Sequence, residues 1–216
     1  PHFPSYEAFN EYLEACCRMR LAEKLRGHSG TIGQRLQRDL SAFLPLPTTP
    51  YDACIKFPTK VSSFSLVRYK TNDYSVPTIY GHRDVLIKAY VDEILVCCGS
   101  ECIARHSRSY DKEDFIFDPL HYLALLERKI NALDQAAPLA GWQLPECFST
   151  LRRLLESRMG TAGKREYVQV LRLMEMFSPE QVETAIKQAL KLGAIGFDAV
   201  KHLLLCIIER KPPRLD

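Results

Sequence analysis

The chain has 216 residues, of which 46% are hydrophobic and 25% are charged, and its formal net charge is +3. This composition is typical of a globular protein of one or two domains. No apolar run approaches the roughly 20 residues of a membrane-spanning helix, and no signal peptide is visible, so we expect neither a membrane span nor export.

Eight cysteines lie inside apolar segments or at their ends, and four of them form the adjacent pairs Cys16–Cys17 and Cys97–Cys98. A free cysteine in such a place behaves as a small hydrophobic residue. Because no export signal accompanies the cysteines, we expect reduced thiols and a cytoplasmic location.

Residues 1–54 are expected to form a helical connector and a Pro-rich linker. Ser5 is a candidate cap for a first helix, which a glycine-containing stretch at 27–30 ends. Thr31 and Gln34 have the spacing of a capping box, in which each side chain hydrogen-bonds an amide at the start of a second helix. Three prolines between positions 45 and 50 lack an amide donor and predict an extended linker.

Residues 55–112 switch to the alternation of apolar and polar side chains that is typical of β-strands. The clearest run is Val85, Ile87, Ala89 and Val91, with more polar neighbours between them. Short turns rich in Gly, Asn and Asp separate this run from similar ones. About six short strands with tight turns predict a small β-barrel, a closed sheet without exposed edges.

Residues 113–216 return to helical spacing and predict an all-helical C-terminal domain. Ser178 is followed by a proline at the first helical position and by Gln181 at the capping-box position. Gly193 is placed to end that helix, and a last helix is expected over about 198–210. The predicted fold is therefore α+β, with a small β-barrel flanked by an N-terminal helical pair and a C-terminal helical bundle.

All of the excess positive charge lies in the strand segment. Residues 56–112 carry nine basic and six acidic side chains, whereas residues 1–55 carry six of each and residues 113–216 carry fourteen of each. A local basic excess favours contact with a polyanion such as DNA. The candidate DNA-binding residues are Arg68, Lys70, Arg83, Lys88, Arg105 and Arg108, which alternate with tyrosines. The same pattern fits a solvated exterior over an aromatic core, and both interpretations stay open.

Motifs for catalysis are weak throughout the chain. Cys98, Cys102 and His106 are spaced four apart, but a hairpin turn between them keeps the three side chains from converging on a metal. The stretch 160–164 has glycines and a lysine without the spacing of a phosphate-binding loop. Acids at the predicted turns suit turn geometry alone. We therefore predict no catalytic residue, no metal site and no cofactor in this chain.

Seven motifs occur in order along the chain: Leu66–Pro77, Tyr80–Arg83, Phe117–Tyr122, Leu125–Lys129, Ala132–Leu139, Phe197–His202 and Pro212–Asp216. In this order they resemble the IstA-type transposases, the large subunit of the insertion sequence twenty-one family. The resemblance extends over nearly the whole chain, and several long motifs in one order make it specific.

The resemblance implies a modular bacterial transposase. In that family, helix-turn-helix domains bind the element ends, and an RNase H-like domain holds three acids that bind divalent metal (Mg). A Mu-transposase-like β-barrel and a helical tail follow. This chain matches the barrel and the tail, so no catalytic acid is carried over and we expect the chain to be inactive alone. The implied partners are double-stranded DNA, an AAA+ ATPase and further transposase copies.

The sequence thus supports two functional hypotheses. In the first, residues 55–112 contact transposon-end or target DNA, as a non-catalytic C-terminal part of a transposase that contributes DNA binding and transpososome assembly. In the second, the charge-balanced helical tail docks on the ATPase or on a second transposase subunit through apolar residues such as Leu125 and Leu205. A decayed reading frame without an independent role is a third interpretation.

Overall fold

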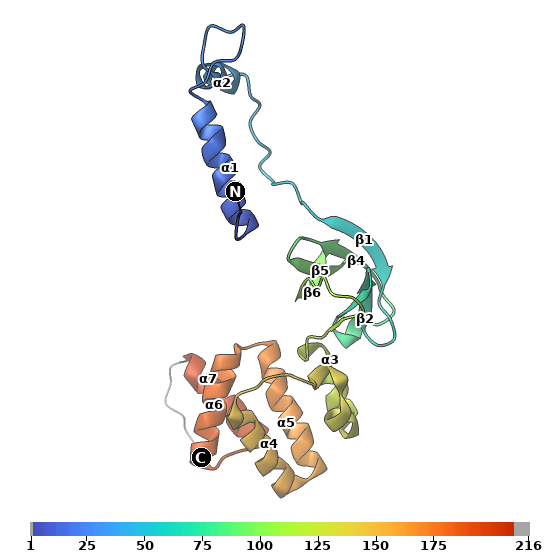
Figure 1. Ribbon diagram of the computed structural model, residues 1–216. Helices are drawn as coiled ribbons and strands as arrows, with labels where there is room; N and C mark the ends of the chain where they lie inside the picture. The colour runs from blue at the N-terminus through green and yellow to red at the C-terminus, as the bar shows by residue number, and fades with distance from the viewer. Residues whose placement is uncertain (1, 210–216) are drawn as a thin grey trace. The chain divides into compact units, whose positions relative to one another are not determined.

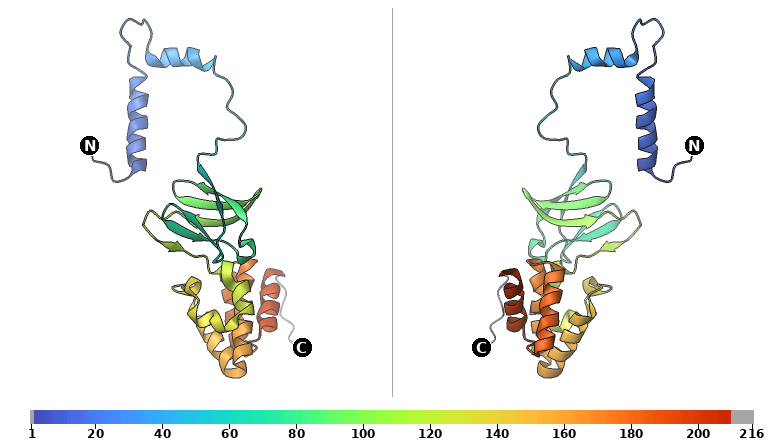
Figure 2. Two further views of the ribbon diagram at one scale, coloured as in Figure 1. Left: turned by 90° about the vertical axis from the view of Figure 1, so that its right-hand side faces the viewer. Right: turned by 90° about the vertical axis from the view of Figure 1, so that its left-hand side faces the viewer.

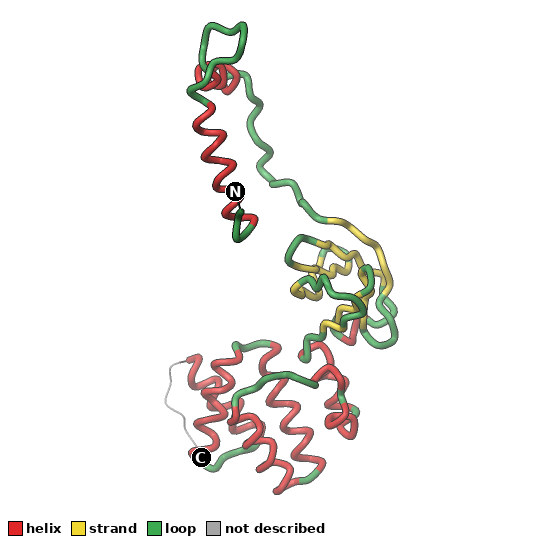
Figure 3. Tube along the Cα trace, in the orientation of Figure 1, coloured by secondary structure: helices red, strands yellow, loops and turns green. Residues whose placement is uncertain are grey.

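The computed structural model describes residues 2–209, and the contacts within the chain divide it into two compact units. The first unit ends at Asp52 and the second begins at Ala53. Figures 1 and 3 show two helices in the first unit, and strands followed by further helices in the second. No helix among residues 2–209 is both long and apolar enough to cross a membrane. The predicted end of the last helix at Arg210 and the motif at 212–216 lie outside the described residues.

The first unit consists of α1 (Tyr6–Arg20) and α2 (Ile32–Leu40), which cross instead of running side by side (Figure 2). The predicted caps are confirmed: Ser5 Oγ accepts a hydrogen bond from an amide of the first turn at 3.2 Å, and Thr31 and Gln34 form a complete capping box. Neither helix contains a buried residue. The chain after α2 has no helix or strand until β1, as its prolines predict.

In the described part of the second unit, residues 53–209, seven strands form two sheets. Their bounds are β1 Ile55–Lys60, β2 Leu66–Tyr69, β3 Asn72–Ser75, β4 Asp84–Ala89, β5 Glu93–Cys98, β6 Glu101–Ser107 and β7 Phe115–Ile116. The larger sheet has the order β1-β4-β5-β6 and is antiparallel throughout. The smaller sheet has the order β2-β3-β7, and β7 runs parallel to β3.

The predicted closed barrel is wrong, because neither sheet closes on itself. β1 and β6 are the edges of the larger sheet, and β2 and β7 are the edges of the smaller one. Closure needs a continuous ladder of hydrogen bonds, and the alternation of side chains reveals which residues face inward but not which strands pair. The smaller sheet is completed by β7, whose two residues are too few for alternation to reveal.

Both sheets share one hydrophobic core. Its buried residues are Val61, Val67, Tyr69, Tyr74, Val76, Val85, Ile87, Ala89, Ile94, Val96 and Ala104. The predicted alternation of β4 is confirmed, since its apolar residues at 85, 87 and 89 are all buried. Val91 departs from the prediction and is 70% exposed, because the strand ends before it. The remaining residues of β4 face away from this core.

The helices of the second unit enclose a separate core. Their bounds are α3 Leu120–Arg128, α4 Glu146–Met159, α5 Thr161–Arg172, α6 Pro179–Leu192 and α7 Phe197–Glu209, with short 3-10 helices at Thr78–Tyr80, Ile130–Gln135, Ala137–Leu139 and Leu173–Glu175. The core is built on fully buried residues such as Leu123, Leu151 and Ile186. The predicted capping box of α6 and its left-handed Gly193 are both confirmed.

A buried polar cluster joins the strands to the helices. Ser75 ends β3, and its hydroxyl accepts a hydrogen bond from the Asp118 amide at 2.8 Å and lies 2.9 Å from His121 Nδ1 on α3. His106 of β6 donates from Nε2 to the Ser75 carbonyl oxygen at 2.6 Å. The two imidazole rings pack edge to face, with 5.7 Å between their centroids. Ser75 therefore connects one strand of each sheet with the first long helix that follows.

Burial keeps both histidines of this cluster neutral. Removal from water lowers the pKa of His106, and it lowers the pKa of His121 to about 4. The nearby Asp118 carboxylate opposes this shift of the His121 pKa, and the neighbouring His106 ring reinforces it. A neutral His121 accepts a hydrogen bond from the Ser75 hydroxyl at Nδ1, so its own proton is on Nε2, 3.6 Å from an Asp118 oxygen.

We predict that the stability of the chain falls as the pH is lowered from about 6.5 to about 4. In this window the unfolded chain binds protons on these histidines, whereas the folded chain does not, so protonation favours unfolding. The His121→Asn variant keeps a hydrogen-bond acceptor for Ser75 and removes the titrating group, so its Tm should depend less on pH. Thermal unfolding followed by circular dichroism between pH 4 and pH 7 measures the slope. The exposed His82→Asn variant is the matched control, and an equal flattening in both variants would contradict the assignment.

Candidate nucleic-acid interface

The outward face of the larger sheet carries a row of basic residues that runs across the strands. Lys56 of β1 is directly paired with Lys88 of β4, Lys88 is paired with Leu95 of β5, and Leu95 is paired with Arg105 of β6. Paired residues of an antiparallel sheet project from the same face. Three of the four positions in this row are therefore cationic, and they come from three different strands.

The neighbouring rows on this face contain both signs of charge. Lys60 is paired with Asp84 at one end of β4, and Arg105 Nη1 lies 2.9 Å from Glu93 Oε2 in an exposed ion pair. Together the paired outward positions carry four basic side chains (Lys56, Lys60, Lys88 and Arg105) and two acidic ones. Like charges directly opposite each other, such as Lys56 and Lys88, are unfavourable in a sheet. A net positive face of this kind favours an anionic ligand.

Lys56 was missed by the sequence argument, which named only Lys88 and Arg105 of this row. β1 has a weak pattern, with Pro58 in its middle and five of its six residues exposed. Its alternation therefore does not mark one face as buried. The register with β4 was the missing information, because that register places Lys56 opposite Lys88. A search for basic residues an even number of positions apart within one strand would have found Lys56 and Lys60, which both lie in β1.

Lys70 and Arg108 meet at the ring of Tyr69. The Lys70 ammonium lies 6.0 Å and the Arg108 guanidinium 5.6 Å from the centroid of this ring. Arg108 also lies 4.6 Å from the ring centroid of Tyr110, and its Nη1 donates to the Tyr90 carbonyl at 2.5 Å. Arg108 is half-buried between two rings, so it holds the chain after β6 against the end of β4. Its main contribution is structural, and Lys70 is the exposed cation of the pair.

Arg68 and Arg83 lie apart from both groups. Arg68 of β2 faces Asp73 of β3 across the hairpin and donates to its two carboxylate oxygens at 3.0 and 2.5 Å. This hydrogen bonding raises the pKa of the Arg68 guanidinium, whose charge is largely offset by Asp73. Arg83 precedes β4 at the end opposite to Tyr90 and stacks over the Tyr80 ring at 5.7 Å. The six predicted residues therefore do not form one patch, and only Lys88 and Arg105 share a row.

The three residues considered for a metal site are not arranged around a common point. His106 is buried against Ser75, whereas Cys102 is exposed on β6. Within residues 2–209 no group of three or more His, Cys, Asp or Glu side chains is placed to hold a metal ion. In the glycine-containing stretch at 160–164, Gly160 separates α4 from α5 and the other residues form the first turn of α5, where Lys164 pairs with Asp134.

An apolar cavity of about 530 Å³ lies where the smaller sheet meets α3 and the chain after it. Its walls include Phe64 and Leu66 from the strand side and Leu125 from α3. The stacked rings of Phe115 and Phe117, with centroids 6.0 Å apart, form another wall. Leu125 was predicted from the sequence to make a contact outside the helical core, and the structure places it at this cavity.

Comparison with known proteins relates the chain to transposases. Residues 46–118 match the family described as Mu transposase, C-terminal domain. A transposase of Aminobacter aminovorans is 32% identical over 225 aligned residues, which include all of this chain and 43% of the relative. The transposases for insertion sequences IS1326/IS1353 of Pseudomonas aeruginosa and Shigella flexneri are each 29% identical over 99% of this chain and 42% of the relative. No solved structure matches the chain.

These matches support the prediction of a transposase. The family match begins in the linker after α2 and ends just before α3, so it includes all seven strands of the two sheets. The chain spans less than half of the length of the relatives that it matches. Its similarity to them continues on both sides of the strands, through the first unit and the helices. Membership of the narrower IstA-type group stays a prediction.

We predict that the Arg108→Lys variant lowers the thermal stability of the strands without a change in net charge. A lysine keeps the positive charge, but it loses the flat stacking between Tyr69 and Tyr110 and part of the bond to the Tyr90 carbonyl. The expected loss is about 1–2 kcal/mol, measured as a shift in chemical denaturation. Lys70→Gln serves as the control because its side chain is exposed, and an equal loss there would refute the structural role of Arg108.

Proposed function

We propose that the chain is a non-catalytic C-terminal part of an insertion-sequence transposase, of the IstA type that its motifs resemble, and that it binds double-stranded DNA. The observation that carries the DNA contact is the cross-strand row of Lys56, Lys88 and Arg105. The transposase context is supported by the match to a Mu transposase C-terminal domain and by the similarity to whole transposases.

The row is suited to phosphates and not to bases. Its cations lie on three strands of a four-stranded sheet, with Leu95 of β5 between Lys88 and Arg105, and neighbouring strands of a sheet lie about 4.8 Å apart. Long basic side chains on a half-exposed sheet reach phosphate oxygens and carry no base-specific pattern. We therefore propose sequence-independent contact with transposon-end or target DNA. Among the other predicted residues, Lys70 and Arg83 lie outside the row and would make separate contacts. Arg68 and Arg108 contribute least, because their guanidinium groups are hydrogen-bonded to Asp73 and to the Tyr90 carbonyl.

The strand-transfer chemistry is proposed to lie outside this chain. None of the catalytic acids of the resembled family is matched here, and the described residues contain no cluster that would hold a divalent metal. On this proposal the Mg-dependent step belongs to an RNase H-like domain, and the sheets position DNA for that domain. Self-association within a transpososome is part of the same proposal.

Binding of a fluorescent duplex of random sequence, measured by anisotropy at several salt concentrations, tests the proposal. We expect the logarithm of the binding constant to fall linearly with the logarithm of the salt concentration. The variant with Lys56→Gln, Lys88→Gln and Arg105→Gln should lose about 0.9 units of slope for each phosphate contact removed, so up to about 2.7 units.

The matched control changes the same amount of charge on the helices. Arg158→Gln, Lys191→Gln and Lys129→Gln replace three exposed cations that lie outside the strands. The dependence of DNA binding on salt concentration in this control variant should stay near that of the unchanged chain. Equal losses in both triple variants would indicate a general charge effect, and binding without salt dependence would contradict the proposed contact.

A second candidate function is docking of a partner protein in the apolar cavity beside α3. The favouring observation is that this cavity combines Leu125 with the exposed rings of Phe64 and Phe115, which are 77% and 54% exposed. The proposed partner is the AAA+ ATPase of the same element or a second transposase subunit. This candidate and DNA binding use different surfaces, because the cavity borders the smaller sheet and the basic row lies on the larger one.

We predict that Leu125→Glu abolishes retention of the ATPase in a pull-down with purified proteins. A carboxylate in an apolar cavity loses its hydration, so a docked complex would be weakened by about 2 kcal/mol or more. Leu205→Glu on α7 is the control, since Leu205 is 38% exposed and lies outside the cavity. If the Leu205 variant loses the ATPase and the Leu125 variant retains it, the docking surface is on α7 instead.

A further inference from the structure

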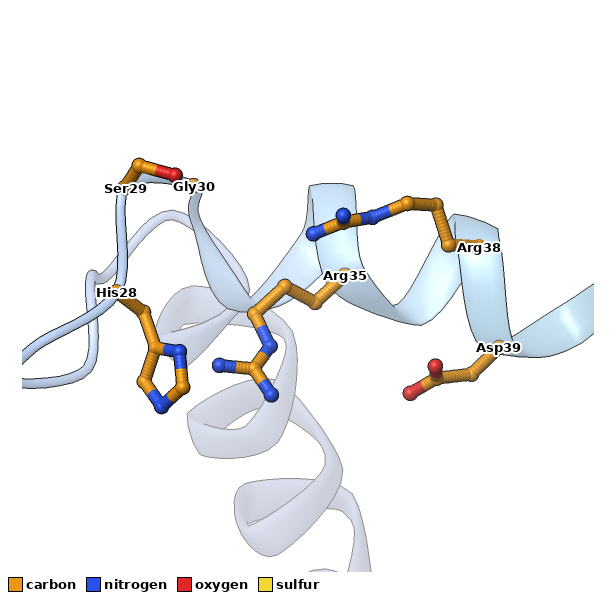
Figure 4. Close-up of a pocket in the computed structure, with 6 residues that line it drawn as sticks. All are labelled: His28, Ser29, Gly30, Arg35, Arg38 and Asp39. Atoms are coloured by element: carbon orange, nitrogen blue, oxygen red, sulfur yellow. The ribbon is translucent and has the colours of Figure 1, made fainter.

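A small polar cavity lies between the loop that follows α1 and the exposed side of α2. It is lined by His28, Ser29, Gly30, Arg35, Arg38 and Asp39, and its volume is about 410 Å³. Figure 4 shows Arg35 and Arg38 extending from α2 toward the loop, with the Arg35 guanidinium facing the His28 ring. A water molecule occupies roughly 30 Å³, so the cavity has room for a phosphate group and several waters. All of its lining residues belong to the first unit.

One side-chain atom of Arg35, a residue that lines this cavity, lacks a partner. Arg35 Nη1 is shielded from solvent, and no hydrogen-bond acceptor for it exists among residues 2–209. An unsatisfied buried donor costs about 1–3 kcal/mol, and more when it carries charge. Proteins rarely keep such a group unless a ligand, water or ion completes its hydrogen bonds. The missing partner must be an acceptor, and beside a guanidinium an anionic oxygen is the most favourable one.

The surroundings of Arg35 are strongly basic. Residues 18–38 contain six arginines and lysines and one acidic residue, Glu23. Arg38 is one helical turn from Arg35, so two guanidinium groups face the same loop. Asp39 is the one carboxylate in the lining. A free phosphate ion carries more charge and more acceptor oxygens than a carboxylate, and a nucleic-acid backbone presents a series of singly charged phosphates.

The backbone around the cavity is fixed before any ligand arrives. The amides of Ile32 and Gly33 donate to the Glu23 and Leu21 carbonyls at 2.9 and 2.8 Å, and these bonds tie both ends of the loop together. A Cβ at Gly33 would lie 3.1 Å from the Leu21 carbonyl oxygen, so the close approach of the two helices requires a small residue. The capping box at Thr31 fixes the start of α2. Binding therefore needs little ordering of the loop.

We infer that this cavity is a phosphate-binding site, in which Arg35 and Arg38 hold one phosphate group of a nucleic-acid backbone or a free phosphate ion. The Ser29 hydroxyl is available as a further donor on the loop side. The site goes beyond the proposed contact of the larger sheet, because it lies in the other unit of the chain and shares no residue with the basic row. The basic excess around it favours the backbone of a nucleic acid as the source of the phosphate.

Anisotropy with duplex DNA and the complete chain tests the site through the Arg35→Gln variant. We expect about five- to tenfold weaker binding at low salt and a salt slope reduced by about one unit. Arg20→Gln removes the same charge from the end of α1, where Arg20 is paired with Glu23 outside the cavity, and it should change the affinity less than twofold. Asp39→Asn removes the one opposing carboxylate and should tighten binding. Circular dichroism of each free variant verifies that the helices are unchanged.

Resonances of the Ser29 and Gly30 amides and of the Arg35 side chain distinguish the two phosphate sources. If both inorganic phosphate and duplex DNA shift these resonances, the cavity takes a backbone phosphate. A shift with inorganic phosphate alone supports the site with the free ion as its ligand. If neither ligand shifts them, the phosphate site is overturned. If inorganic phosphate shifts them but Arg35→Gln binds DNA as the unchanged chain does, the nucleic-acid backbone is excluded as the source of the phosphate. The triple variant at Lys56, Lys88 and Arg105 tests the contact of the larger sheet independently. Failure of the phosphate site and failure of the sheet contact are therefore distinguishable.

Discussion

The register between β1 and β4 is the constraint on which the basic face depends. Side chains alternate along a strand, so a shift of one residue would move Lys56 to the opposite face of β1 and bring Phe57 to the outward row. Burial of Ile87 determines which face of β4 is outward and so places Lys88 there, and the pairing of β1 with β4 places Lys56 opposite Lys88. The energy that places Lys88 therefore comes from apolar packing on the other side of the same sheet.

The role of each basic residue depends on the groups around it and not on its charge alone. Six cations were expected from the sequence, and two of them, Arg68 and Arg108, are held by an aspartate or by carbonyl and aromatic groups. Their positions stabilise the hairpin and the chain end. Lys88 and Arg105 lie in a row with Lys56, and Arg105 forms an exposed ion pair with Glu93. A surface cation is informative about ligand binding only after its partners within the protein are known.

The helix caps were predicted correctly from the sequence, but the pairing of the strands was not. The caps at Ser5, Thr31 and Ser178 depend on residues within one turn of a helix, and all three are present. The open sheets depend on which strands meet, which alternation does not specify. The smaller sheet needs β7, a two-residue strand about forty positions after its partner β3, and so short a run carries no periodic signal.

For the candidate sites too, the sequence revealed where charge accumulates along the chain but not which residues the fold brings together. Charge counts located the basic excess in the strand segment, but the row appears only when three strands are aligned. The polar cavity of the first unit was missed altogether, because charge over residues 1–55 balances when it is summed over the whole segment. The imbalance is visible only within residues 18–38, where the loop and α2 bring Arg35 and Arg38 to one place. Counting the charges over shorter segments of the sequence would have revealed this imbalance.

The parallel pairing of β7 with β3 determines how the chain can be divided into fragments. The Asp73 amide donates to the Asp114 carbonyl at 2.9 Å, and the Asn72 side chain bonds both Ser109 and Asp114. A fragment that stops at residue 112, where strand-like alternation ends, would leave the edge of β3 open beside aromatic side chains. Unpaired edges of this kind recruit strands from other molecules. Such a fragment would be expected to aggregate, although it would contain every strand that the sequence predicts.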